Sequence, residues 1–215
     1  MADEPDPTTS WTDWHHAYAD PASPLSQRLA VVVARIREAL DLLPGGPLRL
    51  ISVCAGQGHD VVGALAGHPR ADDVTGRLVE ADPTNAGLAH AALQGAGLDR
   101  IEVVCADAAV TTAYDGAAPA DLLLLCGVFG NVTDDDVRTT VTTARMLCAA
   151  GGVVLWTRHR RAPDLTPTIR GWFDEAGFDE LAFDSPGPDS YSVGMHRSRE
   201  EPVALAPVRM FAFVR

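Results

Sequence analysis

The stretch Ile51-Ser-Val-Cys-Ala-Gly-Gln-Gly-His-Asp60 decides how the rest of the chain can be understood. The apolar, β-branched run over 48–53 is typical of a buried strand, and a helical pattern of apolar residues begins at Val61. Between them, Gly56 and Gly58 permit backbone angles that other residues avoid and let a ligand lie close to the chain. A strand, a glycine turn and a helix in this order can present backbone N–H groups to a nucleotide-like ligand, although such a turn can also serve packing alone.

Composition sets the protein class. The 215 residues are 47% hydrophobic, which suits one α/β domain with a sizeable core. The net charge of −12 argues against a nucleic-acid surface. No apolar run is long enough to span a membrane, and the acidic N-terminus does not resemble a signal peptide, so we expect a cytoplasmic protein without membrane contact. The histidines and cysteines show no metal-binding spacing, so no metal is expected.

The chain alternates strand and helix patterns from residue 48 onward, which predicts a parallel sheet with right-handed crossovers. Ser23-Pro24 predicts a helix start before the first strand, and Thr133 predicts another. Two late strands joined as a hairpin would place one antiparallel strand in the sheet. The expected strands are 48–54, 74–80, 101–105, 121–126, 153–157, 179–184 and 208–214, with helices near 59–67, 84–96 and 167–176.

The N-terminal segment 1–22 is a separate unit in this interpretation, and residues 23–215 form the domain. At helical spacing Trp11, Trp14 and Tyr18 share a face, with His15 beside them. Buried rings contribute a large apolar area, so the segment should dock on the body. Two roles stay open for it, simple packing or a lid that closes over a ligand.

Candidate ligand contacts follow successive strands, at the carboxyl edge where open α/β sheets bind ligands. Glu80 ends the second strand 22 residues beyond Gly58, where a carboxylate can accept hydrogen bonds from both ribose hydroxyls. Asp107 follows the third strand and could accept a hydrogen bond from an adenine amino group. Each could instead be a surface acid, an alternative that is weaker for Glu80 than for Asp107.

This order of features resembles the class I S-adenosylmethionine-dependent methyltransferases over roughly residues 25–215. The resemblance implies a Rossmann-like, doubly wound seven-stranded sheet in the order 3-2-1-4-5-7-6, mostly parallel with one antiparallel strand near the C-terminus. It also implies S-adenosylmethionine as cofactor and S-adenosylhomocysteine as product. The segments that carry it are Ser52–Asp60, Leu78-Val-Glu-Ala-Asp-Pro83, Cys105-Ala-Asp107, Asp121–Phe129 and Leu147-Cys-Ala-Ala-Gly-Gly152.

The resemblance also implies a set of cofactor contacts. Ser52 and Cys54 replace the usual acid and first glycine of the motif, so the contact to the methionine ammonium is open among Asp60, His15 and Tyr18. The full cofactor set is Ser52, Cys54, Ala55, Gly56, Gln57, Gly58, Asp60, Glu80, Ala81, Ala106, Asp107, Ala108, Cys126, Gly127 and Phe129.

The acceptor side is less well defined. Three histidines are candidate bases, which a hydroxyl acceptor would need and an amine or acidic carbon would need less: His15, His159 and His196. The candidate substrate contacts are Trp14, Tyr18, Asn131, Arg158 and Tyr191. The cluster around Arg158 is more typical of a solvated face, with a substrate anion as the second interpretation. The cysteines at the strand ends are better explained as small packing residues.

The predicted function is methyl transfer from S-adenosylmethionine to a small-molecule acceptor, with a homodimer as a further candidate partnership. A non-methylating S-adenosylmethionine enzyme or a sensor is the first alternative. A nicotinamide-dinucleotide oxidoreductase fits less well, because its motif needs a third glycine where this chain has Val61.

If residues 11–18 form a lid, their deletion should affect turnover far more than folding. Removing residues 1–19 should lower cofactor affinity and nearly eliminate turnover, because an open site admits water, while the melting temperature falls only modestly. Calorimetry, a methyl-transfer assay and hydrogen exchange on the full chain would test this. Normal cofactor binding by the truncated chain, with unchanged exchange at 11–18 in the full chain, would show packing alone.

Overall fold

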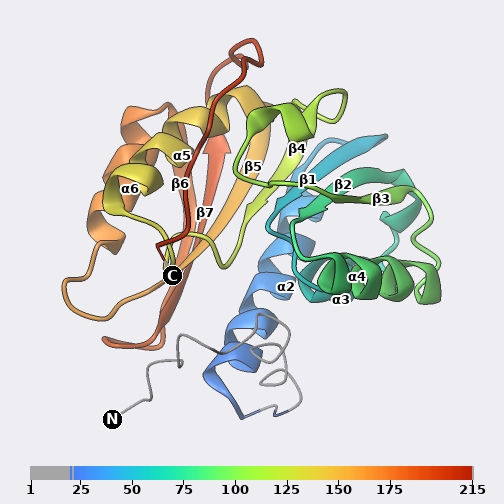
Figure 1. The fold of residues 1–215 in the computed structure, drawn as a ribbon, viewed down its shortest axis with the longest axis horizontal. Helices are drawn as coiled ribbons and strands as arrows, with labels where there is room; N and C mark the ends of the chain where they lie inside the picture. Colours follow the sequence, from blue (N-terminus) through green and yellow to red (C-terminus); the bar gives the residue numbers. More distant parts are fainter. Residues whose placement is uncertain (1–19, 21, 215) are drawn as a thin grey trace.

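The computed structural model describes residue 20 and residues 22–214. The predicted lid, with Trp14, His15 and Tyr18, therefore lies outside the described residues. From α2 (Pro24–Leu42) onward the chain alternates helices and strands around a central sheet (Figure 1). No helix among the described residues is both long and apolar enough to cross a membrane.

Seven strands form one sheet in the order β3-β2-β1-β4-β5-β7-β6, which confirms the predicted fold. β7 is antiparallel to both neighbours, and the other pairs are parallel. The strands are β1 (Leu48–Val53), β2 (Val74–Glu80), β3 (Ile101–Cys105), β4 (Ala120–Leu125), β5 (Cys148–His159), β6 (Phe178–Asp184) and β7 (Tyr191–Ser198).

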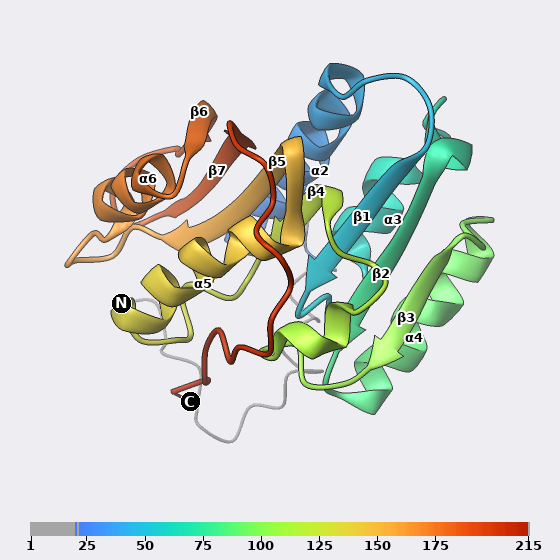
Figure 2. The ribbon, with the colours of Figure 1, turned by 90° about the horizontal axis from the view of Figure 1, so that it is seen from above.

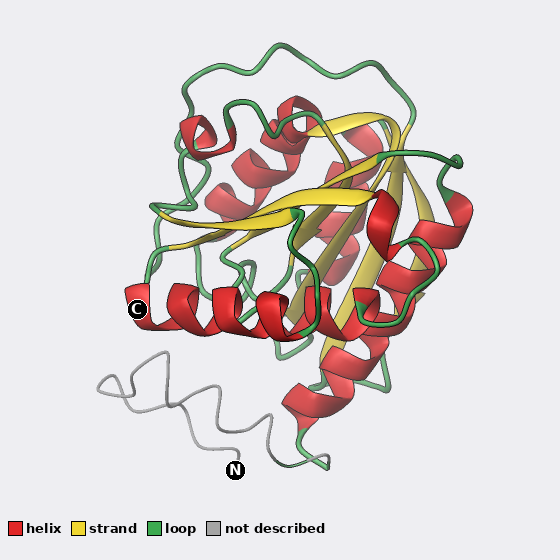
Figure 3. Cartoon of the chain, turned by 90° about the vertical axis from the view of Figure 1, so that its right-hand side faces the viewer, coloured by secondary structure: helices red, strands yellow, loops and turns green. Residues whose placement is uncertain are grey.

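Helices cover both faces of the sheet (Figure 3). One face packs against α2, α3 (His59–Leu65) and α4 (Pro83–Gly95), and the other against α5 (Asp134–Leu147) and α6 (Thr166–Glu175). Two predicted helix starts are confirmed, because the side chains of Ser23 and Thr133 accept hydrogen bonds from the N–H groups of Ser26 and Asp136.

The last predicted strand, 208–214, is wrong: the antiparallel strand is β7 (Tyr191–Ser198), which lies between the two late strands that the sequence predicted. Gly194 lies inside this strand, and an internal glycine weakens the residue pattern by which a strand is predicted from the sequence. A Cβ at this position would lie 2.2 Å from Cε2 of Trp156, so the close approach of the indole requires glycine there.

Residues 199–214 instead form an extended tail that lies along α5 (Figure 2). The carbonyl of Met210 accepts a hydrogen bond from Thr140 Oγ1, and Val203 N–H donates to Arg145 O. Isolated antiparallel bridges join Arg209 to Val110 and Phe213 to Val132. We call this segment the C-terminal tail. It brings the end of the chain to the carboxyl edge of the parallel strands.

Candidate active site

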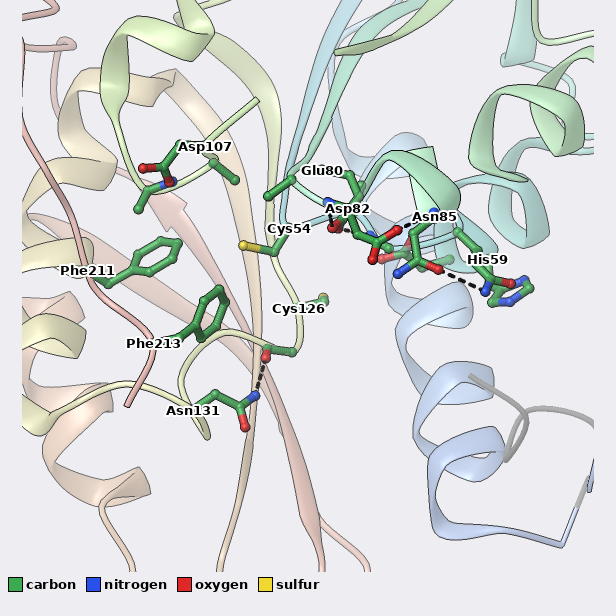
Figure 4. Close-up of a pocket in the computed structure, with 18 of the residues that line it drawn as sticks. Cys54, His59, Glu80, Asp82, Asn85, Asp107, Cys126, Asn131, Phe211 and Phe213 are labelled. Atoms are coloured by element: carbon green, nitrogen blue, oxygen red, sulfur yellow. Dashed lines mark hydrogen bonds between the residues drawn. The ribbon is translucent and has the colours of Figure 1, made fainter. Parts of the chain in front are cut away.

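A pocket opens at the carboxyl ends of β1, β2, β3 and β4, the edge that the sequence predicted (Figure 4). Its cavity volume is about 280 Å³, close to the lower end of the range for small-molecule sites, about 300–1,000 Å³. Most of the predicted cofactor residues line it: Cys54, Ala55, Gly56, Gln57, Asp60, Glu80, Ala81, Asp107, Ala108, Cys126 and Gly127.

The glycine turn after β1 is built from left-handed backbone. Cys54, Gly56 and Gly58 all have positive φ angles, of 54°, 55° and 71°. The turn is closed by a hydrogen bond of 3.0 Å from Gly58 N–H to Ala55 O. The departure from the family motif at Cys54 therefore places a non-glycine residue in a conformation that favours glycine.

Glu80 ties this turn to the loop after β2. Its Oε2 accepts a hydrogen bond of 2.8 Å from Gly56 N–H, and its Oε1 accepts one of 2.9 Å from Asp82 N–H. Asp82 in turn caps α4 by accepting hydrogen bonds from Thr84 N–H and Asn85 N–H. The Glu80 carboxylate is thus fixed at the pocket wall, with its remaining lone pairs available to a ligand.

Asp107 is also fixed. Its Oδ1 accepts a hydrogen bond of 2.9 Å from Ala109 N–H, and its Oδ2 pairs with Arg209 of the C-terminal tail at 2.7 Å. Desolvation acts to raise the pKa of Asp107, but the Ala109 bond and the Arg209 guanidinium outweigh it and hold the pKa below its usual value. The tail thereby supplies a positive charge at the predicted adenine position.

Two further charged residues, Arg28 of α2 and Asp60 of α3, line the same pocket. Burial raises the pKa of Asp60, opposed by a 2.8 Å hydrogen bond from Val61 N–H and by the charge of Arg28. Arg28 was missed by sequence reasoning. Its position in the apolar stripe of α2, three residues after Leu25 and four before Val32, was the available signal.

Some predicted residues do not line the pocket. Ser52 is buried within β1, and Phe129 is buried in the core beside Trp156. Gly58 faces Leu78 and Ala89, so it shapes the turn from outside the cavity. Ala106 is not among the lining residues either; its N–H donates to Glu80 O.

The described residues that were predicted to contact the acceptor or to act as a base differ in position: one lines the pocket and the others do not. Asn131 lines the pocket, and its Nδ2 donates to Gly127 O at 2.9 Å. Arg158 does not line it: its guanidinium donates to Phe129 O and pairs with Asp134 Oδ1 at 3.4 Å. Tyr191 at the start of β7 and His159 at the end of β5 also lie outside the lining.

His196 is buried in the core on β7 and does not line the pocket, so this position gives no support to a catalytic role. Its ring stacks on Phe173 with centroids 4.5 Å apart, and its Nδ1 accepts a hydrogen bond of 3.3 Å from Trp156 Nε1. Burial lowers its pKa to about 4, although the nearby Glu180 carboxylate opposes this and Arg170 reinforces it.

This depressed pKa predicts a pH-dependent stability. Between pH 6.5 and 4 the unfolded chain takes up a proton at His196 that the folded chain does not, so stability falls as pH falls through this window. Each pH unit is worth up to about 1.4 kcal/mol. His196→Gln should flatten the slope of unfolding free energy against pH from 6.5 to 5, and the exposed His90→Gln should not. An unchanged slope in His196→Gln would contradict this.

All four cysteines are free thiols, and they differ in burial. Cys105 is exposed. Burial raises the pKa of Cys54 and Cys126, which line the pocket, and it raises the pKa of Cys148 to about 12. Thiols with raised pKa values are weak nucleophiles at neutral pH, which fits packing rather than covalent catalysis.

The C-terminal tail supplies the wall that sequence reasoning missed. Met210 N–H donates to Ala109 O at 2.7 Å, and Val214 N–H donates to Asn131 O at 3.0 Å, which holds the tail against the loops after β3 and β4. Figure 4 shows the rings of Phe211 and Phe213 across the cavity from Cys54 and Cys126. The lining residues contributed by the tail are Arg209, Phe211, Ala212 and Phe213.

No family model matches the sequence, and no curated protein matches it. Solved structures do match. An O-methyltransferase family protein from Burkholderia thailandensis aligns at a TM-score of 0.64 and 19% identity, over 87% of this chain and 59% of that one. The CurJ carbon methyltransferase aligns at 0.67 and 15%, over 89% and 59%. Aeropyrum pernix fibrillarin, solved with natively bound S-adenosylmethionine, aligns at 0.57 and 15%, over 75% and 74%.

This is the fold of the class I S-adenosylmethionine-dependent methyltransferases. The chain spans 59% of the length of each of the first two matched structures. Within this methyltransferase fold, the pocket described above lies at the ends of the central strands β1, β2 and β4 and of the adjacent β3.

Proposed function

We propose that this protein is an S-adenosylmethionine-dependent methyltransferase that acts on a small molecule. The observation that carries the proposal is the Glu80 carboxylate, hydrogen-bonded to Gly56 N–H of the glycine turn and facing the same pocket as Asp107. The methyltransferase fold supports the same assignment. A nicotinamide dinucleotide is favoured less, because the third glycine is absent and the cavity is small.

The lining residues fit the chemical groups of the cofactor. Glu80 would accept hydrogen bonds from the ribose hydroxyls, and Asp107 would face the adenine amino group with the Phe211 ring nearby. For the methionine end, Arg28 would bind the carboxylate and Asp60 the ammonium. Carboxylates outnumber guanidinium groups in the lining, which favours a cationic sulfonium ligand: Asp60, Glu80, Asp82 and Asp107 against Arg28 and Arg209.

When bound, the cofactor supplies a methyl group already activated on a sulfonium, and a neutral thioether leaves. The chain's task is to hold an acceptor in line with the methyl group and to exclude water, a proximity effect. His159 and His196 do not line the described pocket, and His15 lies outside the described residues. We therefore assign no general base, and the proposed lid over 11–18 stays a prediction.

Titration of the purified chain with S-adenosylmethionine, S-adenosylhomocysteine and NAD would test cofactor choice. We expect saturable binding of both sulfur compounds and none of NAD. Transfer of a labelled methyl group to an acceptor would then distinguish an enzyme from a sensor. Tight S-adenosylmethionine binding with no transfer to any acceptor would favour the sensor, and binding of NAD alone would favour the oxidoreductase.

A further inference from the structure

One side of the pocket differs from the rest in its chemistry. Among the described residues, the lining contributed by the loop after β4 and by the last lining residues of the tail carries no charged side chain. The polar group there is the Asn131 amide. This uncharged set consists of Asn131, Phe211, Ala212 and Phe213.

The nearest charged lining residues are already held by the protein. Glu80 is bound to two backbone N–H groups, and the Arg209 guanidinium is paired with Asp107 at 2.7 Å. Arg28 and Asp60 come from the helices on the opposite face of the sheet from α5. A charged acceptor packed against the Phe213 ring would give up part of its hydration without gaining a partner charge from these four residues, which is costly.

Phe213 is exposed to an unusual degree for a large apolar residue beside a pocket. Its side chain is 42% exposed, whereas Phe211 is 2% exposed. Its place is nevertheless fixed. Phe213 pairs with Val132 in an antiparallel bridge, Val214 N–H donates to Asn131 O, and the two phenylalanine rings meet edge to face with centroids 5.4 Å apart. An exposed ring held in position next to a cavity is typical of a binding surface.

We propose that Phe213 contacts the methyl acceptor, and that the acceptor is an uncharged molecule with a flat aromatic body. This inference rests on the proposed function, because the acceptor has to lie beside the bound cofactor. An aromatic acceptor would pack its face or edge on Phe213, covering the exposed ring. The Asn131 amide would provide one polar contact for a hydroxyl or amine on that ring system.

The test uses the full chain saturated with S-adenosylhomocysteine, and 2-naphthol as the probe. We expect the parent protein to bind 2-naphthol, and Phe213→Ala to bind it about tenfold more weakly, since a packed ring would be lost. Phe213→Trp should retain binding, which separates loss of the ring from damage to the tail. Val214→Ala, at an adjacent position 59% exposed and outside the lining, is the matched control and should bind as the parent does.

Charge and cofactor affinity provide the remaining comparisons. We expect 2-naphthalenesulfonate to bind at least tenfold more weakly than 2-naphthol, and Phe213→Ala to bind S-adenosylhomocysteine within twofold of the parent. Equal binding of 2-naphthol by the parent and Phe213→Ala, equal binding of the sulfonate, or no 2-naphthol binding by the loaded protein would each overturn the inference. Failure of the parent to bind S-adenosylhomocysteine would instead overturn the proposed function on which the inference rests.

Discussion

Replacing Glu80 by alanine is expected to weaken S-adenosylmethionine binding by one to two orders of magnitude while the domain still folds. A hydrogen bond to a charged group contributes about 1.5–3 kcal/mol, and each 1.4 kcal/mol is a factor of about ten in affinity. The structure adds a second reason. Without the carboxylate, Gly56 N–H and Asp82 N–H lose the partner that holds the turn and the next loop together.

Glu80→Gln separates the contact to the ligand from the support of the turn only in part, because one amide oxygen can replace only one of the two carboxylate oxygens. We expect it to be nearly as defective as Glu80→Ala. Glu102→Gln is the matched control, since Glu102 is an exposed acid on the neighbouring strand β3 that pairs with Arg77 away from the pocket. Calorimetry that gave the parent affinity for folded Glu80→Ala would contradict this prediction.

Gly58→Val is expected to abolish measurable cofactor binding. Gly58 has φ +71° at the start of α3, where a β-branched residue is strained by about 1–2 kcal/mol or more. A Cβ would also lie 3.2 Å from Leu78 Cδ2 and 3.6 Å from Ala89 Cβ, so the turn would have to shift. The effect reaches the ligand through the backbone of the turn, since Gly58 itself does not line the pocket.

Gly67→Val provides the control for this experiment. Gly67 has the same φ of +71°, but a Cβ there meets no atom within 4 Å. Both variants should lose stability from backbone strain, and only Gly58→Val should lose cofactor binding. Melting curves and calorimetry on both proteins measure the two effects separately. Parent-like affinity in Gly58→Val would show that the turn does not shape the cofactor site.

The parts of the fold that could be predicted are those with local signals. The ends of β2 and β3 were predicted correctly because loop residues flank each strand: Asp72-Asp73 and Asp82-Pro83 around β2, and Asp99-Arg100 and Asp107 around β3. β7 could not be predicted, because the need for Gly194 arises from Trp156, nearly forty residues earlier. In the sequence this glycine argues against a strand, whereas in the folded chain the packing of Trp156 requires a glycine at this position.

The site, too, has parts with local sequence signals and parts that depend on long-range contacts. Glu80 ends β2 and Asp107 lies two residues after β3, so their positions are given by the local pattern and the parallel topology. The tail residues Arg209 and Phe213 reach the pocket through backbone bonds to residues roughly a hundred positions away, such as Ala109. Sequence patterns carry no information about such a path, and the stretch 208–214 was therefore interpreted as a strand.

The central claim is that the pocket at the strand ends binds S-adenosylmethionine through Glu80. The most direct test is isothermal titration of S-adenosylhomocysteine into the parent, Glu80→Gln and Glu102→Gln. We predict one site per chain in the parent and in Glu102→Gln, and affinity reduced by at least about tenfold in Glu80→Gln. The absence of binding to the parent, or equal affinity in all three folded proteins, would contradict the claim.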